Sequence, residues 1–460
     1  MKHNFNRIFA SIAFLMLIPL ALGAQGLKGS YFLDGSIQRT YLNPAFMPRS
    51  NYINLPGIGG MQADIQTTAG LSTFLYPKNG RLYTFLNKNV SAEEFTQNLP
   101  DDIGLNLKLD VPVLDLGFFL GDNGFLTVDV GAEVFADGII NPDLLRFLKL
   151  GMDSDAASYD LSGTNISQSA LVHAGVGYTM DLSDKVPGLS VGAKFKYLAL
   201  VDYASVDMEK ASLNLTQDKW VMDSKISDTV VMGGLTKDAS ASGIFPYKMG
   251  GFGLAGSGVA LDLGVEYELP FQGIKLSASV LNLGALSGKN GVVGTSNGSV
   301  SYEGLKNVSS LDDITGDNSQ LSKSLEDLEK LIDFAYAEGK SVAVSTLPRI
   351  YLGVEYPFND KMSAGLLFSN VSGFHRSVSE LTASFNYKPT ESLRAAVDAS
   401  FLSAGASFGF DLEFLPKAGV AIALGTDSCC VKVSPQFIPI NPVNTNFHLG
   451  ISIALGGGRE

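Results

Sequence analysis

Charge is scarce in this sequence. Only 17% of its 460 residues are Asp, Glu, Lys or Arg, against about 25% in an average soluble domain. The formal net charge is −13, whereas nucleic-acid binding requires a clustered basic surface. We therefore expect no nucleic-acid partner, and we expect a large face of the protein to lack charge.

Histidine is also rare, which leaves little material for chemistry. The four histidines are His3, His173, His375 and His448, and their spacing builds no metal site. The glycine-rich residues 250–258 lack the lysine of a phosphate-binding loop. No Ser/His pair or pair of carboxylates can be placed at a defined mouth. The sequence thus predicts no enzyme activity, no catalytic residue, no cofactor and no metal.

Cysteine occurs only twice, as the adjacent pair Cys429 and Cys430. In an oxidising compartment such a pair can close a strained ring. A local disulfide, two free thiols and an intermolecular link all stay open, and we favour a local disulfide without a catalytic role.

Long apolar runs are absent except at the N-terminus. Lys2 and Arg7 precede an apolar run at residues 8–22, which small residues follow. This order is typical of a secretory signal peptide, so we predict that residues 1–24 are removed, with the cut between residues 23 and 25. The apolar run is shorter than the roughly 20 residues of a spanning helix, and no later run approaches that length.

Alternation of apolar and polar residues runs through most of the mature chain. Residues 259–269 are the clearest case, with Val259, Leu261 and Leu263 on one face and Asp262 and Glu266 on the other. About 14 segments have this pattern at roughly the 9–11 residues that a tilted membrane strand needs. We predict strands at residues 52–68, 104–119, 125–136, 169–180, 189–203, 259–269, 274–286, 349–357, 361–370, 380–388, 392–402, 404–414, 417–426 and 446–455.

The connections between these strands alternate between short turns and long loops, as they do in outer-membrane barrels. Alternation alone does not separate a barrel from a water-soluble sandwich. An exported, apolar chain without a spanning helix nevertheless has few structures open to it other than a closed barrel. We predict an all-β fold, a transmembrane antiparallel β-barrel of about 14 strands formed by residues 52–460, in the outer membrane and in contact with its lipid. Pro112 lies inside a predicted strand and is expected at a bulge, and Leu213 and Trp220 indicate an extra hairpin in the long connection at 204–258.

Residues 25–51 do not alternate. They hold the turn signal Asp34-Gly35-Ser36 and two prolines, which are typical of a compact, turn-rich segment. We predict that this segment is a plug in the barrel or an arm on its periplasmic side.

An Asn-Pro-Ala triplet at residues 43–45 follows soon after the predicted mature N-terminus. Together with the strand number, it resembles the long-chain fatty acid transporter (FadL-like) family of outer-membrane barrels and the related Bacteroidota barrels associated with type IX secretion. The resemblance implies a barrel of about 14 strands with an N-terminal segment folded into the lumen. On the residues alone, the triplet is equally well explained as an ordinary turn.

The polar face of the predicted strands carries charges of both signs. In a barrel this face points into the lumen, because charge facing lipid is costly. The inward candidates are Asp129, Glu133, Lys194, Lys196, Asp262, Glu266, Arg394, Asp398, Asp411 and Glu413. We favour cross-strand ion pairs over a substrate path for them. Asp34, Arg39 and Asn43 are expected to join this network if the N-terminal segment folds inside.

Two insertions are predicted to be helical. Residues 142–150 follow the cap residue Asn141 and begin with proline. Residues 319–338 place leucines at helical spacing. Helices packed on the barrel's own rim are favoured over a partner site.

Two functions remain open from the sequence. The first is a gated channel that takes up a small hydrophobic compound. It rests on the resemblance, on the predicted plug and on the aromatic residues within 71–85, which can equally form an interfacial girdle. The alternative is a non-conducting scaffold that binds a partner protein in a secretion or cell-surface assembly.

Overall fold

The computed structural model describes residues 27–152, 155–237, 246–249, 253–303, 331, 333–402, 405–428 and 444–457. The predicted signal peptide and the pair Cys429 and Cys430 lie outside these residues, as does the main part of the helix predicted at 319–338. Among the described residues, no helix is long and apolar enough to span a membrane.

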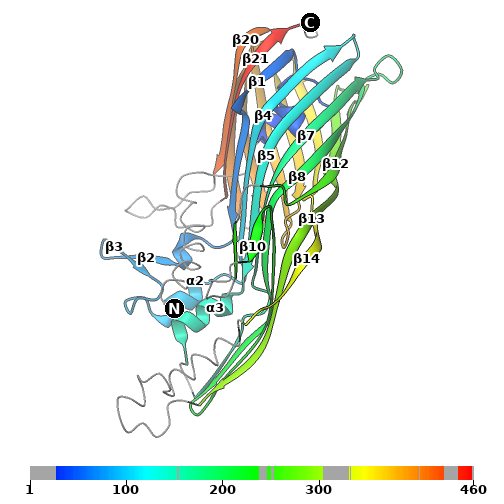
Figure 1. Cartoon of the computed structure of the whole chain (residues 1–460). Helices are drawn as coiled ribbons and strands as arrows, with labels where there is room; N and C mark the ends of the chain where they lie inside the picture. Colours follow the sequence, from blue (N-terminus) through cyan, green and yellow to red (C-terminus); the bar gives the residue numbers. More distant parts are fainter. Residues whose placement is uncertain are drawn as a thin grey trace.

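Fourteen antiparallel strands close into one barrel (Figure 1). They are β1 (Asn51–Thr67), β4 (Ile103–Leu120), β5 (Gly124–Ile140), β7 (Asn165–Asp181), β8 (Leu189–Thr216), β12 (Gly256–Glu268), β13 (Lys275–Tyr302), β15 (Arg349–Asn359), β16 (Met362–Val371), β17 (Val378–Thr390), β18 (Leu393–Leu402), β19 (Gly405–Phe414), β20 (Ala418–Ser428) and β21 (Asn444–Gly456). Each strand pairs with the next in this order, and the last, β21, pairs with β1. All 14 predicted strands are therefore confirmed, and the last strand does close the barrel.

Burial shows which way the alternation points. On β12 the side chains of Val259, Leu263 and Val265 are exposed on the outside, whereas Asp262 between them is buried inside. A soluble sandwich would bury the apolar face instead. The exposed apolar belt suits lipid, so the barrel prediction is confirmed over the sandwich.

The two ends of the barrel differ. At one end, here the short-turn end, tight connections such as 121–123 and 415–417 join neighbouring strands. At the other, the long-loop end, the connections include 68–102, 141–164 and 217–255. The predicted parity is confirmed, and it places both residue 51 and residue 456 at the short-turn end.

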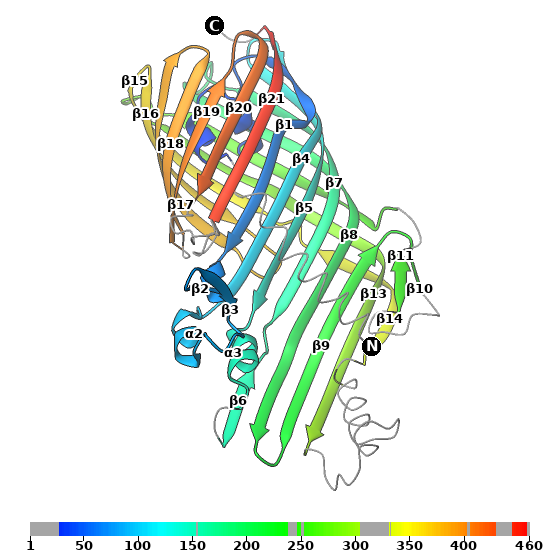
Figure 2. The same ribbon diagram turned by 90° about the vertical axis from the view of Figure 1, so that its left-hand side faces the viewer.

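Two strands are much longer than predicted. Strands β8 and β13 each have 28 residues, which span about 90 Å at the usual rise per residue. Beyond the barrel they are joined by β9 (Trp220–Met232), which pairs with β8 on one side and with β13 on the other. These three strands form a sheet that extends well past the rest of the barrel (Figure 2). The predicted extra hairpin through Leu213 and Trp220 is the β8–β9 hairpin.

Smaller elements lie at the long-loop end. They are the 3-10 helix η4 (Leu71–Thr73), β2 (Leu75–Lys78), β3 (Arg81–Thr84), α2 (Ala92–Asn98), α3 (Pro142–Leu150), β6 (Ala156–Asp160), β10 (Leu235–Lys237), β11 (Tyr247–Met249) and β14 (Ala335–Val344). The predicted helix at 142–150 is α3, and the Asn141 side chain accepts a hydrogen bond from the Asp143 amide at its start. The prediction of helix at 335–338 is wrong, because Tyr336 and Ala337 pair with Gly294 and Val293 of β13.

The aromatic residues within 71–85, which the sequence leaves open as support for a channel or as an interfacial girdle, pack together in a compact cluster. Phe74, Tyr76, Tyr83 and Phe85 pack with Phe95 of α2 in a small separate core beyond the long-loop end. The rings of Phe85 and Phe95 are stacked with centroids 5.3 Å apart. This core holds the hairpin β2–β3 against α2 and α3 (Figure 1).

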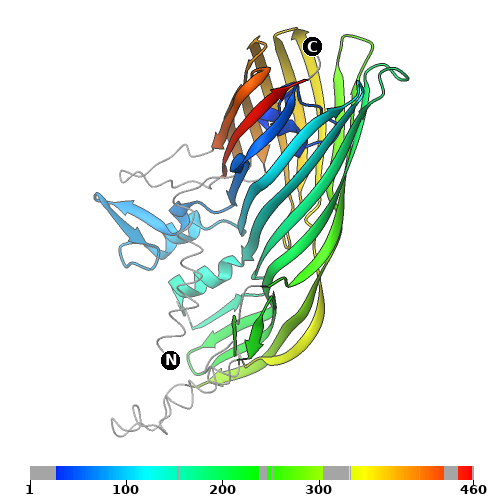
Figure 3. The same ribbon diagram turned by 45° about the horizontal axis from the view of Figure 1, so that its top comes forward.

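The N-terminal segment, residues 27–50, lies inside the barrel at its short-turn half (Figure 3). It contains the 3-10 helices η2 (Gly29–Phe32) and η3 (Gln38–Tyr41). Tyr31, Phe32 and Phe46 of this segment pack with Leu281 and Tyr351 of the wall in a buried apolar cluster. We call residues 27–50 the plug.

Candidate functional site in the barrel lumen

The Asn-Pro-Ala triplet seats the plug on the barrel wall. The Asn43 side chain accepts a hydrogen bond from the Ala45 amide at 2.9 Å and donates to the backbone carbonyls of Val265 and Ala278 on β12 and β13. The first contact makes a local turn, and the other two fix that turn to the wall. The triplet is therefore a turn that also contacts the wall.

Two glycines create the space for this turn. Gly192 of β8 and Gly264 of β12 lie opposite each other in neighbouring strands. A Cβ on Gly192 would collide with the backbone of Pro44, and one on Gly264 would collide with the Asn43 side chain. Thr179 completes the seat by donating a hydrogen bond of 2.6 Å to the Pro44 carbonyl. Glycine is required here because the two backbones approach so closely.

Arg39 holds the plug together and ties it to the wall. Its guanidinium contacts Asp34 at 2.7 Å and Glu266 of β12 at 3.1 Å, and it lies 3.8 Å from the centre of the Phe46 ring. Arg39 is only 2% exposed, whereas the Asp34 side chain is 64% exposed at the short-turn end. A buried guanidinium needs such partners, because an unpaired buried charge is very costly.

Further polar contacts link the plug to the opposite wall. Lys28 contacts Glu380 at 2.5 Å, and Arg394 donates to the Asp34 carbonyl at 2.7 Å. Ser30 donates to Asp411 at 2.7 Å. The plug is thus bonded to strands on both sides of the barrel.

A compact cluster of polar side chains lies where the pairing of β1 with its neighbouring strands is interrupted. Asp115 accepts hydrogen bonds from Tyr41 of the plug, from Tyr52 at 3.2 Å and from Asn54 at 2.6 Å. Next to it, the register of β1 is interrupted between Asn54 and Met61 against β21 and between Ile53 and Gln62 against β4. The predicted bulge at Pro112 is confirmed on the facing stretch of β4.

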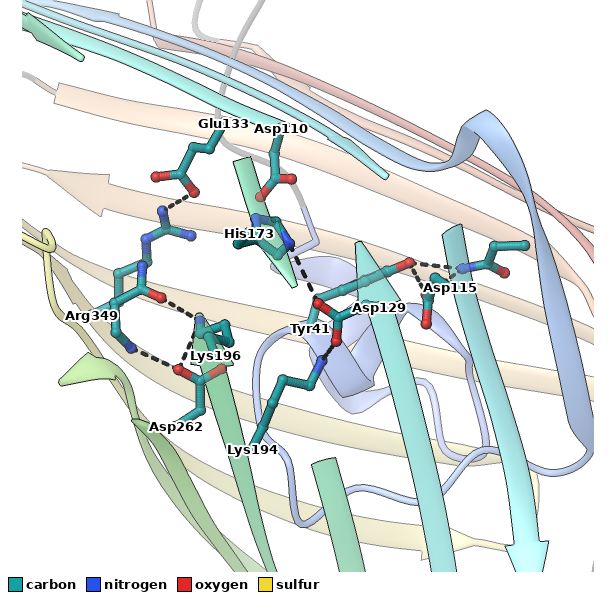
Figure 4. Close-up of polar contacts among 12 residues, drawn as sticks. Tyr41, Asp110, Asp115, Asp129, Glu133, His173, Lys194, Lys196, Asp262 and Arg349 are labelled. Atoms are coloured by element: carbon teal, nitrogen blue, oxygen red, sulfur yellow. Dashed lines mark hydrogen bonds and ion pairs between the residues drawn. The ribbon is translucent and has the colours of Figure 1, made fainter. Parts of the chain in front are cut away.

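On the side of the plug that faces the long-loop end, a charged chamber occupies the middle of the lumen (Figure 4). Its volume is about 80 Å³, which is room for a few water molecules. Its lining residues come from the plug and from the wall. They are Thr40, Tyr41, Leu42, Gly60, Gln62, Asp110, Pro112, Asp115, Asp129, Val130, Glu133, Leu171, His173, Lys194, Lys196, Leu198, Asp262, Leu281, Asn282, Thr346, Arg349 and Tyr351.

Six charged side chains of this chamber form ion pairs across strands (Figure 4). The ion pairs are Lys194 with Asp129 at 2.6 Å, Lys196 with Asp262 at 2.8 Å, and Arg349 with Glu133 at 2.7 Å. His173 lies 3.4 Å from Asp129. No group of three or more potential metal ligands is found among the described residues. The arrangement neutralises buried charge, and its chemistry is that of a hydrated, polar space.

An apolar layer lies next to the chamber on its side away from the plug. Its buried residues are Leu198, Leu200, Val231, Ala255, Ala260, Leu286 and Val344, with Leu171, Tyr203, Val342 and Phe374 packed against them. Phe374 belongs to the short loop 372–377 between β16 and β17. The lumen therefore has three levels from the short-turn end: plug, charged chamber and apolar layer.

Comparison with protein families gives one match, over residues 44–427, to the family of unknown function DUF5723. The chain belongs to this family. None of the curated proteins compared is similar to it in sequence.

Several solved structures are similar to this member of the family. A FadL homologue of Pseudomonas aeruginosa has a TM-score of 0.42 at 10% sequence identity, with 93% of this chain and 96% of that chain covered. The toluene transporter TbuX of Ralstonia pickettii has a TM-score of 0.40 at 10% identity, with 95% of each chain covered. The toluene transporter TodX of Pseudomonas putida has a TM-score of 0.38 at 11% identity, with 91% and 93% covered.

The residues singled out from the sequence fall into two groups in the structure. Asp129, Glu133, Lys194, Lys196 and Asp262 line the chamber. The others lie around the plug. They are Asp34, Arg39, Asn43, Glu266, Arg394, Asp398, Asp411 and Glu413. Asp398 and Asp411 lie beside Gly29 of the plug. Glu413 lies near Ser36 and Arg394.

Sequence reasoning missed several members of the lumen. Arg349 is the first residue of a predicted strand and belongs to its inward face, and His173 and His448 alternate with outward residues in theirs. The same alternation that located the other charges could therefore have placed these three side chains in the lumen. His448 lies 2.9 Å from Asp411. Tyr41 and Phe374 could not be found this way, because their contacts are set by segments outside the strands.

Proposed function

We propose that this protein is a gated channel of the outer membrane, closed at rest, that admits a small hydrophobic compound. The observation that carries the proposal is that two segments that are not part of the wall pack inside the lumen. These are the plug and the loop 372–377. Either can move without breaking the hydrogen bonds that close the barrel.

The orientation follows from the connections. Outer-membrane barrels keep short turns in the periplasm and long loops outside. The plug then faces the periplasm, and the apolar layer with Phe374 faces the exterior. A compound from outside meets the apolar layer first, which supports a hydrophobic substrate.

The charged chamber sets a limit on that substrate. Its ion pairs are fixed across strands, so a guest meets water and paired charge beside apolar side chains such as Leu171 and Leu198. A small neutral compound can cross such a space, whereas a long apolar chain would leave much of its surface in contact with polar groups. We therefore include small size and neutrality in the proposal.

A second function is favoured by a different observation. The sheet of β8, β9 and β13 extends far beyond the barrel (Figure 2), and a channel does not need it. A non-conducting scaffold that presents this sheet to a partner protein would use it directly. The association with Bacteroidota and with type IX secretion stays a prediction.

Transport can be tested in vesicles whose outer leaflet is lipopolysaccharide, which slows the passage of apolar dyes. Uptake of the neutral dye N-phenyl-1-naphthylamine into vesicles with and without the protein separates the two functions. The channel proposal predicts faster uptake with the protein and no change for a charged dye of the same size. Equal uptake with and without the protein contradicts the channel and leaves the scaffold.

A further inference from the structure

The loop 372–377 is folded inward and held over the lumen. The buried carboxylate of Asp137 accepts hydrogen bonds from the backbone amides of His375 at 2.9 Å and Arg376 at 3.3 Å. The His375 ring lies 2.7 Å from the Ser167 hydroxyl. A Cβ on Gly373 would collide with the Asp137 carboxylate, so this loop can approach the wall only with glycine at that position.

The fold of the loop delivers one phenyl ring into the apolar layer. The Phe374 ring packs edge to face against Phe135, with centroids 5.6 Å apart, and against Tyr203, with centroids 5.4 Å apart. Leu171 and Leu200 belong to the same cluster. Edge-to-face contacts with two aromatic rings are specific to an aromatic guest, because they use its quadrupole as well as its area.

This position lies on the path from the exterior to the chamber. Leu171 and Leu198 belong both to the apolar layer around Phe374 and to the lining of the charged chamber. The apolar space is therefore one layer deep, and a guest that extends further meets paired charges. Its depth suits one ring and excludes a long chain.

We propose that the pocket filled by Phe374 is a binding site for a small neutral aromatic compound, and that Phe374 is its built-in occupant. The compound binds when the loop lifts and its own ring takes the place of the phenyl group between Phe135 and Tyr203. Asp137 is buried under the loop, so lifting the loop exposes its carboxylate, and entering water can then replace the two amide donors. This inference rests on the proposed channel and names its entry site.

Removing the built-in occupant tests the proposal. In Phe374→Ala the loop keeps its backbone bonds to Asp137, but nothing competes for the pocket. If the wild-type pocket is free about a tenth of the time, the variant binds about tenfold more tightly. The probe is fluorobenzene, followed by fluorine-19 NMR on the protein in detergent, with fluorocyclohexane as a non-aromatic probe of similar size.

The matched control is Phe401→Ala, the same change at a ring that is 57% exposed on the barrel wall. We expect tighter binding of fluorobenzene by Phe374→Ala, wild-type binding by Phe401→Ala, and a smaller gain for fluorocyclohexane. Unchanged or weaker fluorobenzene binding by Phe374→Ala overturns the proposal, and so does an equal gain in the control.

Failure of the aromatic-site proposal can be distinguished from failure of the channel proposal. A protein that carries dye but whose Phe374→Ala variant gains no affinity is a channel without this site. A protein that carries no dye but whose variant gains affinity selectively keeps the site and loses the channel.

Discussion

Single residues of the plug bond to other parts of the plug and to the barrel wall at the same time. Arg39 is the clearest, since one buried guanidinium contacts a carboxylate of the plug, a carboxylate of β12 and an aromatic ring. Its two carboxylate partners are unequal, because Asp34 is largely exposed and Glu266 is 19% exposed. Water can therefore partly replace the guanidinium for Asp34 but less so for Glu266.

Replacement of Arg39 by methionine keeps most of the side-chain volume and removes the charge. We expect Arg39→Met to reduce the free energy that holds the plug by about 1–3 kcal/mol, mainly because Glu266 loses a charged donor. Hydrogen exchange of the backbone amides of Thr40 and Leu42, which are bonded within the plug, should become roughly 5- to 150-fold faster. The exposed Arg81 provides the control variant Arg81→Met. Unchanged exchange in Arg39→Met would show that the ion pairs do not hold the plug.

At the scale of elements, strands β8 and β12 are more than parts of the wall. Their facing glycines, Gly192 and Gly264, leave a flat place on the inner surface where the Asn-Pro-Ala turn lies. Thr179 of the neighbouring strand β7 and Ser190 of β8 itself add hydrogen bonds to the plug backbone. The two glycines therefore provide the space for the turn, and the hydrogen bonds then hold the turn in that space.

A side chain at Gly192 should displace the plug while leaving the barrel closed. In Gly192→Val we expect trypsin to cut after Arg39, which is 2% exposed in the native protein, and mass spectrometry should detect a peptide that begins at Thr40. The control is Ala193→Val on the same strand, whose side chain points to the outer face. The heat-dependent gel shift of a folded barrel verifies both variants. A Gly192→Val barrel that is folded and still resists cleavage would contradict the role of the seat.

The elements that could be predicted from the sequence are the strands whose apolar and polar residues alternate with a period of two. All 14 barrel strands alternate, because one face meets lipid and the other the lumen, and this constraint ends at the membrane. Beyond it, β8 and β13 continue with polar residues on the exposed face, such as Asn214 and Ser299, and their length was underestimated. The start of α3 was predictable from Asn141 and Pro142, whereas residues 335–338 followed a helical pattern and form a strand through pairing with β13.

At the scale of the whole molecule, the fold is a wall with a filled interior. The sign and phase of the inward charges could be predicted from the sequence, whereas their partners, such as Arg349 for Glu133, are seen only in the structure. The seat of Asn43 joins residues more than 200 positions apart in the chain. Periodicity carries no information about such pairings, so neither the seat nor the position of Phe374 could be predicted.

We propose that the lumen is closed at rest by the plug and by the loop that carries Phe374. The most direct measurement is conductance in planar lipid bilayers, with the wild-type protein, a variant lacking residues 27–48, and that deletion combined with Phe374→Ala. Each barrel is first checked by its heat-dependent gel shift. We predict no steady conductance for the wild type, brief openings for the deletion and a steady conductance for the combined variant. A folded combined variant that stays closed, or a wild-type protein that conducts steadily, would contradict this account.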